Sequence, residues 1–190
     1  MTSVLNSTLV AALIASITTM VGFFINSFIS KRRNAQHELK KAYADIIASA
    51  RSIRRTLIVF HEFNISFTNM ILTIKDGDAI NMTELDIQKQ AAFNYEAMAN
   101  KYRDILTEQQ GQLDQAFFTL TGTEKGYLVK RWQNKSKDKN DKSLQSAVEK
   151  ILSYKEDPKS IDDAKDTVDT YFKSPLQTIQ KICSDRMQKL

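Results

Sequence analysis

Residues 1–33 read MTSVLNSTLVAALIASITTMVGFFINSFISKRR, and this stretch decides how the rest of the chain is organised. No charged side chain occurs from Met1 to Ser30, and Val, Leu, Ile, Ala, Phe and Met dominate from Val4 to Ile29. A helix needs roughly 20 mostly apolar residues to cross the hydrocarbon core of a bilayer, because each residue rises about 1.5 Å. In lipid, a single segment can pair all its backbone groups only as a helix. We therefore predict a transmembrane helix over residues 1–30.

Two other interpretations of this stretch compete with the membrane span. A cleaved signal peptide carries its positive charge before the apolar run, whereas here Lys31, Arg32 and Arg33 follow it. A buried helix of a soluble core rarely extends this far without a charged residue. Both patterns fit the sequence less well than a membrane span does.

The basic residues after the span also predict its orientation. No Lys or Arg precedes the span, and five follow it closely: Lys31, Arg32, Arg33, Lys40 and Lys41. By the positive-inside rule, the N-terminus is then outside and residues 31–190 are cytoplasmic, at the cell (inner) membrane. The single cysteine, Cys183, excludes an intrachain disulfide and agrees with a reducing compartment. The five basic residues either contact membrane lipid head groups or set the topology alone.

Small and hydrogen-bonding residues recur on one face of the predicted span, at steps of four and three. They are Thr8, Ala12, Ala15, Thr19, Gly22 and Asn26. Helix association in lipid depends on close backbone approach and interhelical hydrogen bonds, so this face predicts a homo-oligomer or a membrane-protein partner. The alternative is that the hydroxyls bond back to their own helix. Steps of seven extend the face to Tyr43, Ala50 and Leu57, which predicts one assembly seam that continues into the cytoplasmic domain.

The predicted fold class is all-α, because the whole chain has two prolines and five glycines and no sustained alternation of strand-forming residues. We expect one N-terminal transmembrane helix, followed by a cytoplasmic bundle built on a long antiparallel helical hairpin plus shorter C-terminal helices. The domains are then residues 1–30 and 31–190. Within the second, the hairpin occupies 31–120 and the shorter helices occupy 121–190.

The first helix of the hairpin is predicted over residues 31–74, which contain neither Pro nor Gly. Its apolar stripe is Leu39, Tyr43, Ile46, Ala50, Ile53, Leu57, Phe60, Phe67, Ile71 and Ile74. Beyond Leu57 the sequence is apolar on several faces, so we expect that end to be the most enclosed part of the core.

A turn at 75–78 and an Asn81 cap introduce the second helix of the hairpin, predicted over 83–120. Its stripe is Ile87, Ala91, Tyr95, Met98, Tyr102, Ile105, Leu113, Phe117 and Leu120. Gly111 is a point where this helix is expected to soften or split.

The C-terminal third reads as a short apolar turn at 127–132, a polar loop at 134–142 and a helix over 144–152. Ser160 is then a cap for a helix that ends at Phe172. Ser174 and Pro175 begin a last helix through Lys189.

The positive charge of the chain is concentrated just after the span. Residues 31–60 hold eight basic and two acidic side chains, whereas the remainder is nearly balanced. Arg51, Arg54 and Arg55 lie too far along the helix to reach a membrane surface, so we expect acidic side chains of a neighbouring helix to pair with them. A phosphate-bearing ligand is the alternative. We do not expect nucleic acid as a partner, because the cluster is small and no binding module accompanies it.

No catalytic, metal-binding or cofactor-binding motif is present, and we expect no enzymatic activity. His61 and Glu62 begin an HExxH-like run that lacks the second histidine, and the one cysteine and two histidines are too dispersed for a metal site. The leading hypothesis is a single-pass membrane protein that assembles or binds a partner through its span and helical bundle, as a scaffold, sensor or complex subunit. The alternative is a membrane-perturbing effector, such as a pore-forming toxin, holin-like or abortive-infection protein, whose spans oligomerise.

Overall fold

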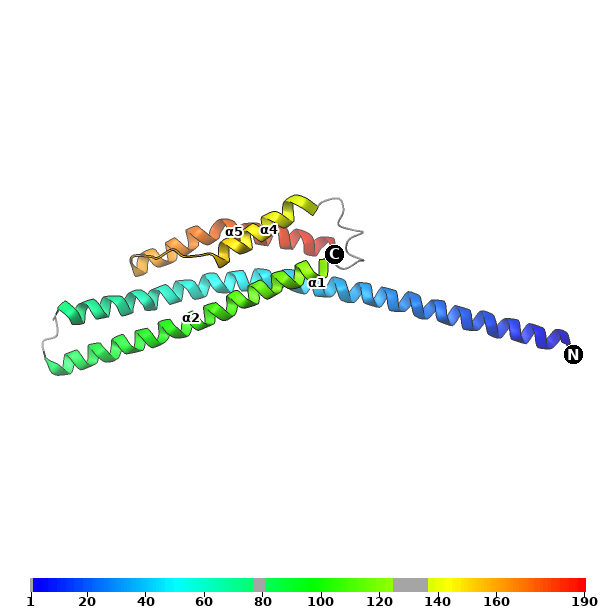
Figure 1. The fold of residues 1–190 in the computed structure, drawn as a ribbon, viewed down its shortest axis with the longest axis horizontal. Coiled ribbons are helices and arrows are strands. Elements are labelled where there is room, and N and C mark those ends of the chain that lie inside the picture. Colours follow the sequence, from blue (N-terminus) through cyan, green and yellow to red (C-terminus); the bar gives the residue numbers. More distant parts are fainter. Residues whose placement is uncertain (1, 77–80, 125–136) are drawn as a thin grey trace. The chain divides into compact units, whose positions relative to one another are not determined.

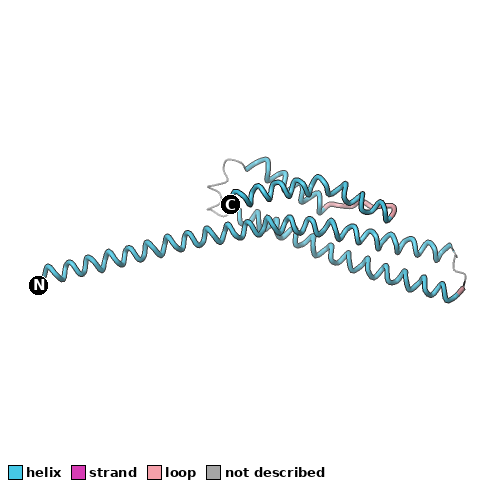
Figure 2. Tube along the Cα trace, turned by 180° about the vertical axis from the view of Figure 1, so that it is seen from behind, coloured by secondary structure: helices cyan, strands magenta, loops and turns pink. Residues whose placement is uncertain are grey.

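The structure, a computed structural model, describes residues 2–76, 81–124 and 137–190, and the side chains of 12, 14–76, 81–120 and 142–190 among them. The described part consists of α1 (Thr2–Asp76), α2 (Met82–Glu124), α4 (Lys137–Leu152) and α5 (Ile161–Lys189) (Figure 1). Figure 2 shows helix throughout these ranges and a loop between α4 and α5. The predicted all-α class is thereby confirmed for the described residues. The apolar turn predicted at 127–132 lies outside them.

The chain divides into two compact units, Met1–Lys40 and Lys41–Leu190. We call them the N-terminal unit and the C-terminal unit. The described part of the N-terminal unit is the first half of α1. The C-terminal unit contains the second half of α1 together with α2, α4 and α5. The predicted boundary at residue 30 separates the membrane span from the rest of the chain and is not a boundary between compact units. It stays a prediction.

Aromatic contacts hold α1 against α2 in the C-terminal unit. The ring of Phe63 stacks on Tyr102, with centroids 5.5 Å apart and an interplanar angle of 14°. The same ring lies 6.4 Å from that of Tyr95, one helical heptad earlier on α2. The guanidinium of Arg103 lies 5.7 Å over the ring of Phe60. These contacts join distant parts of the sequence in the arrangement expected of the predicted hairpin.

α2 begins at the predicted cap and runs without interruption. The backbone N–H of Glu84 donates to Oδ1 of Asn81 at 2.9 Å, which satisfies one of the free donors of the first turn. Gly111 does not split the helix, which continues past the predicted end to Glu124.

The buried seam of α2 differs from the predicted stripe. Its buried residues recur every seven positions: Ala92, Ala99, Leu106, Leu113 and Leu120. The prediction was wrong for Ile87, which is 65% exposed. The predicted stripe contains Met98 and Ile105, whereas the buried residues are their neighbours Ala99 and Leu106. The first half of the predicted stripe is therefore displaced by one residue. Small residues such as Ala99 fit at the seam because they allow the two backbones to approach closely.

The distal end of α1 is less enclosed than residues 39–57 of the same helix, contrary to expectation. From Ile58 to Asp76 the described side chains are buried only at His61 and Ile65, and Leu72 is 50% exposed. The described contacts from the loop between α4 and α5 reach α1 no further than His61, through Tyr154. Beyond that point, the described ring contacts to α1 come from α2, which covers one face.

α4 and α5 pack against each other, and each differs from its prediction in extent. The Tyr171 hydroxyl donates to the Lys150 carbonyl at 2.9 Å. α4 begins at Lys137, inside the segment predicted as a loop, and residues 134–136 lie outside the described part. α5 is one helix with Pro175 in its interior, so the predicted break there was wrong. A proline in a helix interior costs about 3 kcal/mol, and burial of side chains on both sides of Pro175 offsets this cost.

The core of the C-terminal unit draws on all four helices. Ser160 caps α5 as predicted, since its hydroxyl accepts from the N–H of Asp163 at 3.1 Å. The most buried apolar side chains of the unit, outside α2, are Ala42, Tyr43, Ile46, Ala50, Ile53, Leu57, Leu144, Ala147, Val148, Ile151, Ala164, Val168, Phe172, Ile179, Ile182 and Cys183.

Candidate functional site

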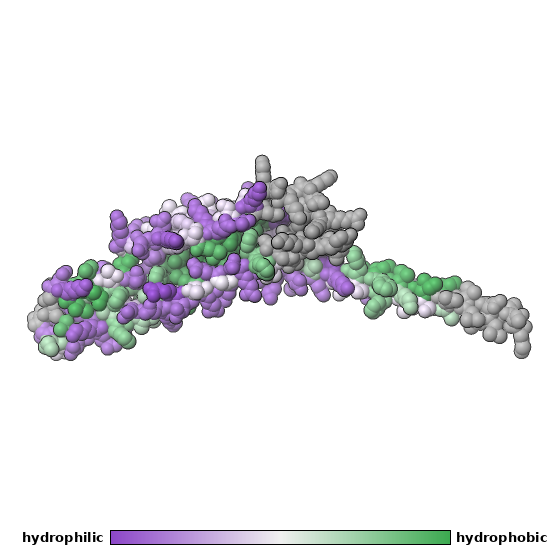
Figure 3. All heavy atoms as spheres, in the orientation of Figure 1, coloured by the Kyte–Doolittle hydropathy of each residue, from purple (hydrophilic) through white to green (hydrophobic). Residues whose placement is uncertain are grey.

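The described part of the N-terminal unit presents a largely apolar surface, shown in green along α1 in Figure 3. Nine of its large apolar side chains, between Ile14 and Ile29, are 41–73% exposed. They are Ile14, Ile17, Met20, Val21, Phe23, Phe24, Ile25, Phe28 and Ile29. Among the described helices, α1 is the one long and apolar enough to cross a membrane, judged by length and composition.

The predicted association face carries one feature that the sequence left open. Ala12, Ala15, Thr19, Gly22 and Asn26 are exposed, whereas Thr8 lies outside the residues with described side chains. The Thr19 hydroxyl donates to the Ala15 carbonyl at 2.8 Å, so it bonds back to its own helix. A Cβ built at Gly22 would meet nothing within 4 Å. On this face, Gly22 therefore allows close approach, and Asn26 has an amide that makes no hydrogen bond to another described residue.

The predicted assembly seam does not continue into the C-terminal unit. Tyr43, Ala50 and Leu57, the positions in phase with the association face, are 3%, 0% and 7% exposed. They pack in the core of the unit, so they are not available to another chain. An apolar heptad stripe has the same sequence pattern whether it packs within its own chain or against another chain. In this protein the stripe packs within its own chain.

The basic residues divide into an exposed group and a group that contacts α5. Lys31, Arg32, Arg33, Lys40 and Lys41 are all exposed.

The prediction that acidic side chains pair with Arg51, Arg54 and Arg55 is confirmed for Arg54. Arg51 contacts an amide instead, and Arg55 is exposed and forms no ion pair among the described residues. Nη2 of Arg54 lies 2.6 Å from Oδ1 of Asp169 on α5, and its Nε donates to the same oxygen at 2.7 Å. With the Gln180 amide oriented to satisfy both partners, the Nε of Arg51 donates to its oxygen at 3.0 Å.

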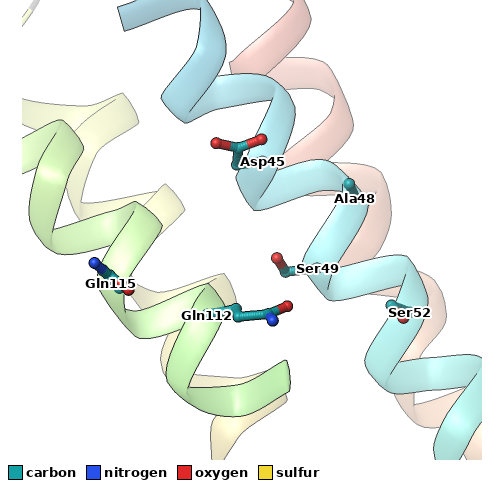
Figure 4. Close-up of a pocket in the computed structure, with 6 residues that line it drawn as sticks. All are labelled: Asp45, Ala48, Ser49, Ser52, Gln112 and Gln115. Atoms are coloured by element: carbon teal, nitrogen blue, oxygen red, sulfur yellow. The ribbon is translucent and has the colours of Figure 1, made fainter. Parts of the chain in front are cut away.

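A cavity of about 480 Å³ lies between α1 and α2 in the C-terminal unit, and sequence reasoning missed it. We call it the polar groove. Its lining residues are Asp45, Ala48, Ser49 and Ser52 of α1, with Gln112 and Gln115 of α2 (Figure 4). The spacing of Asp45, Ser49 and Ser52 by four and three is visible in the sequence. Their position opposite the two glutamines depends on the register of the hairpin, which the sequence pattern does not fix.

His61 is a buried histidine surrounded by aromatic rings. Its side chain is 4% exposed, and its centroid lies 5.3 Å from that of Phe60 and 5.9 Å from that of Tyr154. Nε2 of His61 and the hydroxyl of Tyr154 are both buried, and neither has a hydrogen-bond partner among the described residues. Burial lowers the pKa of His61, and the Asp157 carboxylate opposes that shift. Burial, aided by Glu156 and Asp157, raises the pKa of Tyr154 to about 12.

The remaining titratable groups form no metal site among the described residues. No group of three or more His, Cys, Asp or Glu side chains lies close enough there to hold an ion. Cys183 is fully buried, and burial raises the pKa of its thiol to about 12, so it is not a reactive nucleophile. No family model, curated protein or solved structure matches the chain, so its function must be argued from these features.

Proposed function

We propose that the chain is a single-pass membrane protein whose first thirty residues cross the cell (inner) membrane. Its N-terminus is outside, and its helical bundle lies in the cytoplasm, where it acts as a scaffold, sensor or complex subunit. The observation that carries this proposal is the exposed apolar surface of α1 between Ile14 and Ile29.

The size of that surface favours a bilayer over water. Burial of one large apolar side chain is worth roughly 1.5–3 kcal/mol, so the nine exposed side chains are worth on the order of 15 kcal/mol. A core helix of a soluble domain would bury such side chains within its own chain. Here the described residues of the C-terminal unit have a buried core of their own, whereas these nine side chains of α1 are exposed.

The exposed basic residues support the orientation. Lys31, Arg32 and Arg33 follow the apolar surface immediately, where they would meet cytoplasmic head groups. Anionic lipid attracts a basic residue near the surface by about 1 kcal/mol, so these side chains also stabilise the span in place.

Assembly is proposed to occur through the part of the span that permits close approach. Gly22 has open space around it, and Asn26 brings an amide that gains by pairing with another helix. The burial of Tyr43, Ala50 and Leu57 removes the cytoplasmic part of the predicted seam. Contacts between chains are therefore expected in the membrane, and the bundle's outer surface is left for other partners.

The alternative function, a membrane-perturbing effector, receives less support from the same geometry. A pore needs polar groups that face its lumen. The hydroxyls of Thr18 and Thr19 are bonded to the carbonyls of Ile14 and Ala15, which leaves Asn26 as the polar group of the described face.

The experiment that tests assembly is a mass measurement on the full chain in an uncharged detergent. Wild type is expected to form a defined oligomer or to retain a partner. Gly22→Leu should shift the mass toward the monomer, because the larger side chain keeps the helices apart. Phe24→Leu, on the opposite side of the helix, is the matched control and should leave the mass unchanged. A monomeric wild type without any co-purifying partner would contradict the proposal.

A membrane-potential dye separates the two functions in cells that express the chain. The proposed function predicts no depolarisation on induction. Depolarisation that disappears in Asn26→Leu would replace it with the effector function.

A further inference from the structure

We propose that the polar groove of the C-terminal unit binds a linear aliphatic amine, with the ammonium group on Asp45. The inference does not depend on the membrane span, since every residue that lines the groove belongs to the C-terminal unit.

The groove is built from two facing rows of short polar side chains. Asp45, Ser49 and Ser52 follow one another on one side of α1, over about two turns or roughly 10 Å of helix. Gln112 and Gln115, three residues apart, line the opposite wall on α2. In Figure 4, Asp45 and Ser49 face the helix that carries the two glutamines, and Gln112 reaches toward α1. The elongated shape of the two rows suits a linear ligand.

Fully buried side chains stand next to the lining residues in the sequence. Ile46, Ala50 and Ile53 on α1 directly follow Asp45, Ser49 and Ser52, and Leu113 on α2 directly follows Gln112. All four are 0% exposed. The backbones that carry the polar rows are therefore fixed by the core. The groove volume of about 480 Å³ falls in the range of small-molecule sites, about 300–1,000 Å³.

The hydrogen-bonding groups in the groove are not used by the described protein. Elsewhere on α1, hydroxyls bond back to their own helix, as Ser66 does to the Glu62 carbonyl at 2.8 Å. Ser49 and Ser52 make no such bond, and Asp45 and Gln115 have no partner among the described residues. Gln112 uses its amide N–H on Glu108 at 3.1 Å, which leaves its oxygen free. The Asp45 carboxylate and the free Gln112 oxygen only accept hydrogen bonds. The hydroxyls of Ser49 and Ser52 and the amide of Gln115 accept as well as donate, so a donor-rich ligand can use every one of these side chains.

The sign of the ligand's charge follows from Asp45, the one ionised side chain in the lining. Two further basic residues near the row are engaged on α5, since Arg54 pairs with Asp169 and Arg51 contacts Gln180. Lys41 and Arg55 lie near the two ends of the row on α1, while Glu108 and Asp114 lie near it on α2. These outer charges nearly cancel, so Asp45 decides the local preference for a cation. No aromatic ring lines the groove, and quaternary ammonium groups are usually held by such rings. Primary and secondary amines, which donate N–H groups, are therefore the preferred class.

The test is equilibrium dialysis of radiolabelled spermidine against the full chain in an uncharged detergent without lipid, at about 0.15 M salt, which screens non-specific attraction. We expect saturable binding of one spermidine per chain with a Kd on the order of 0.1–1 mM, since an open site with one exposed charge binds weakly. Asp45→Asn should weaken binding by about tenfold or more, the value of a charge-assisted hydrogen bond. Asp166→Asn, which removes the same charge from an exposed position on α5, should change it by less than about twofold.

A second variant tests the shape of the site without changing its charge. Ala48→Leu fills the groove from an exposed position, so the fold is retained, and binding should fall by about tenfold or more. The uncharged 1,8-octanediol should not compete with spermidine. The proposal is overturned if spermidine does not saturate, if the diol competes equally, or if both aspartate variants lose the same affinity. It is also overturned if Ala48→Leu binds as wild type does.

Discussion

The replacement His61→Phe should remove part of the acid sensitivity of the C-terminal unit. His61 is buried among the rings of Phe60 and Tyr154, and its Nε2 has no hydrogen-bond partner among the described residues. Burial lowers its pKa in the folded chain below the ordinary value of 6.5, although the Asp157 carboxylate opposes the shift. As pH falls through 6.5, the unfolded chain therefore binds a proton that the folded chain resists. Stability is present above that pH and is lost below it.

The magnitude has an upper bound. If the folded histidine stays neutral, proton binding to the unfolded state costs about 1.4 kcal/mol of stability between about pH 7.5 and pH 5.5. The phenylalanine side chain of the variant does not titrate. Over the same pH interval the variant should therefore lose up to about 1.4 kcal/mol less stability than wild type. At neutral pH the variant should also gain about 1 kcal/mol, because an unsatisfied buried nitrogen costs about 1–3 kcal/mol. A slightly larger ring offsets part of that gain.

The assay is thermal unfolding of the full chain in an uncharged detergent, followed by circular dichroism at the two pH values. The two proteins differ only at residue 61, so the difference between their pH dependences reports the contribution of His61. His37 is exposed, and His37→Gln is the matched control, which should keep the wild-type pH dependence. The role of His61 is refuted if His61→Phe loses as much stability at low pH as wild type, or if His37→Gln removes the dependence.

Three further experiments test the packing by chemical denaturation. Ile53→Ala should lose about 2–5 kcal/mol, whereas Ile87→Ala should stay within about 0.5 kcal/mol, and similar losses at both would contradict the burial of Ile53 and the exposure of Ile87. Ser160→Ala should cost about 1 kcal/mol through loss of the α5 cap, and no loss would mean that the cap is not formed in solution. A double-mutant cycle of Arg54→Ala with Asp169→Ala should give a coupling of about 0.5–1 kcal/mol, as expected for a part-exposed pair, and zero coupling would argue against that contact.

Local signals in the sequence predicted the helical class and several helix ends. Asn81 and Ser160 were identified as caps because their side chains satisfy backbone donors within the next three residues, and that chemistry needs no tertiary context. The stripe Ile46, Ala50 and Ile53 was also read correctly, since a dense three-and-four spacing leaves little choice of face.

Features that depend on packing between distant segments were not predictable in this way. Ser174 and Pro175 predict a helix start, but buried neighbours keep α5 continuous through Pro175. Whether Tyr43, Ala50 and Leu57 face their own chain or another chain is not encoded in their spacing, and the structure places them in the core. The polar groove arises from the register of two helices. The sequence alone does not show that Ser49 and Gln112 line opposite walls of one cavity.

The central claim is that the first thirty residues cross the membrane with the bundle inside the cell. A membrane-impermeant maleimide tests it directly on cells that express Ser3→Cys or Lys155→Cys, with the labelled chain recovered from carbonate-washed membranes. Cys183 is fully buried, so the wild-type chain is the unlabelled control. We predict that the residue 3 site is labelled in intact cells and that the residue 155 site is labelled only after lysis. Labelling at residue 155 in intact cells, or release of the chain by carbonate, would contradict the claim.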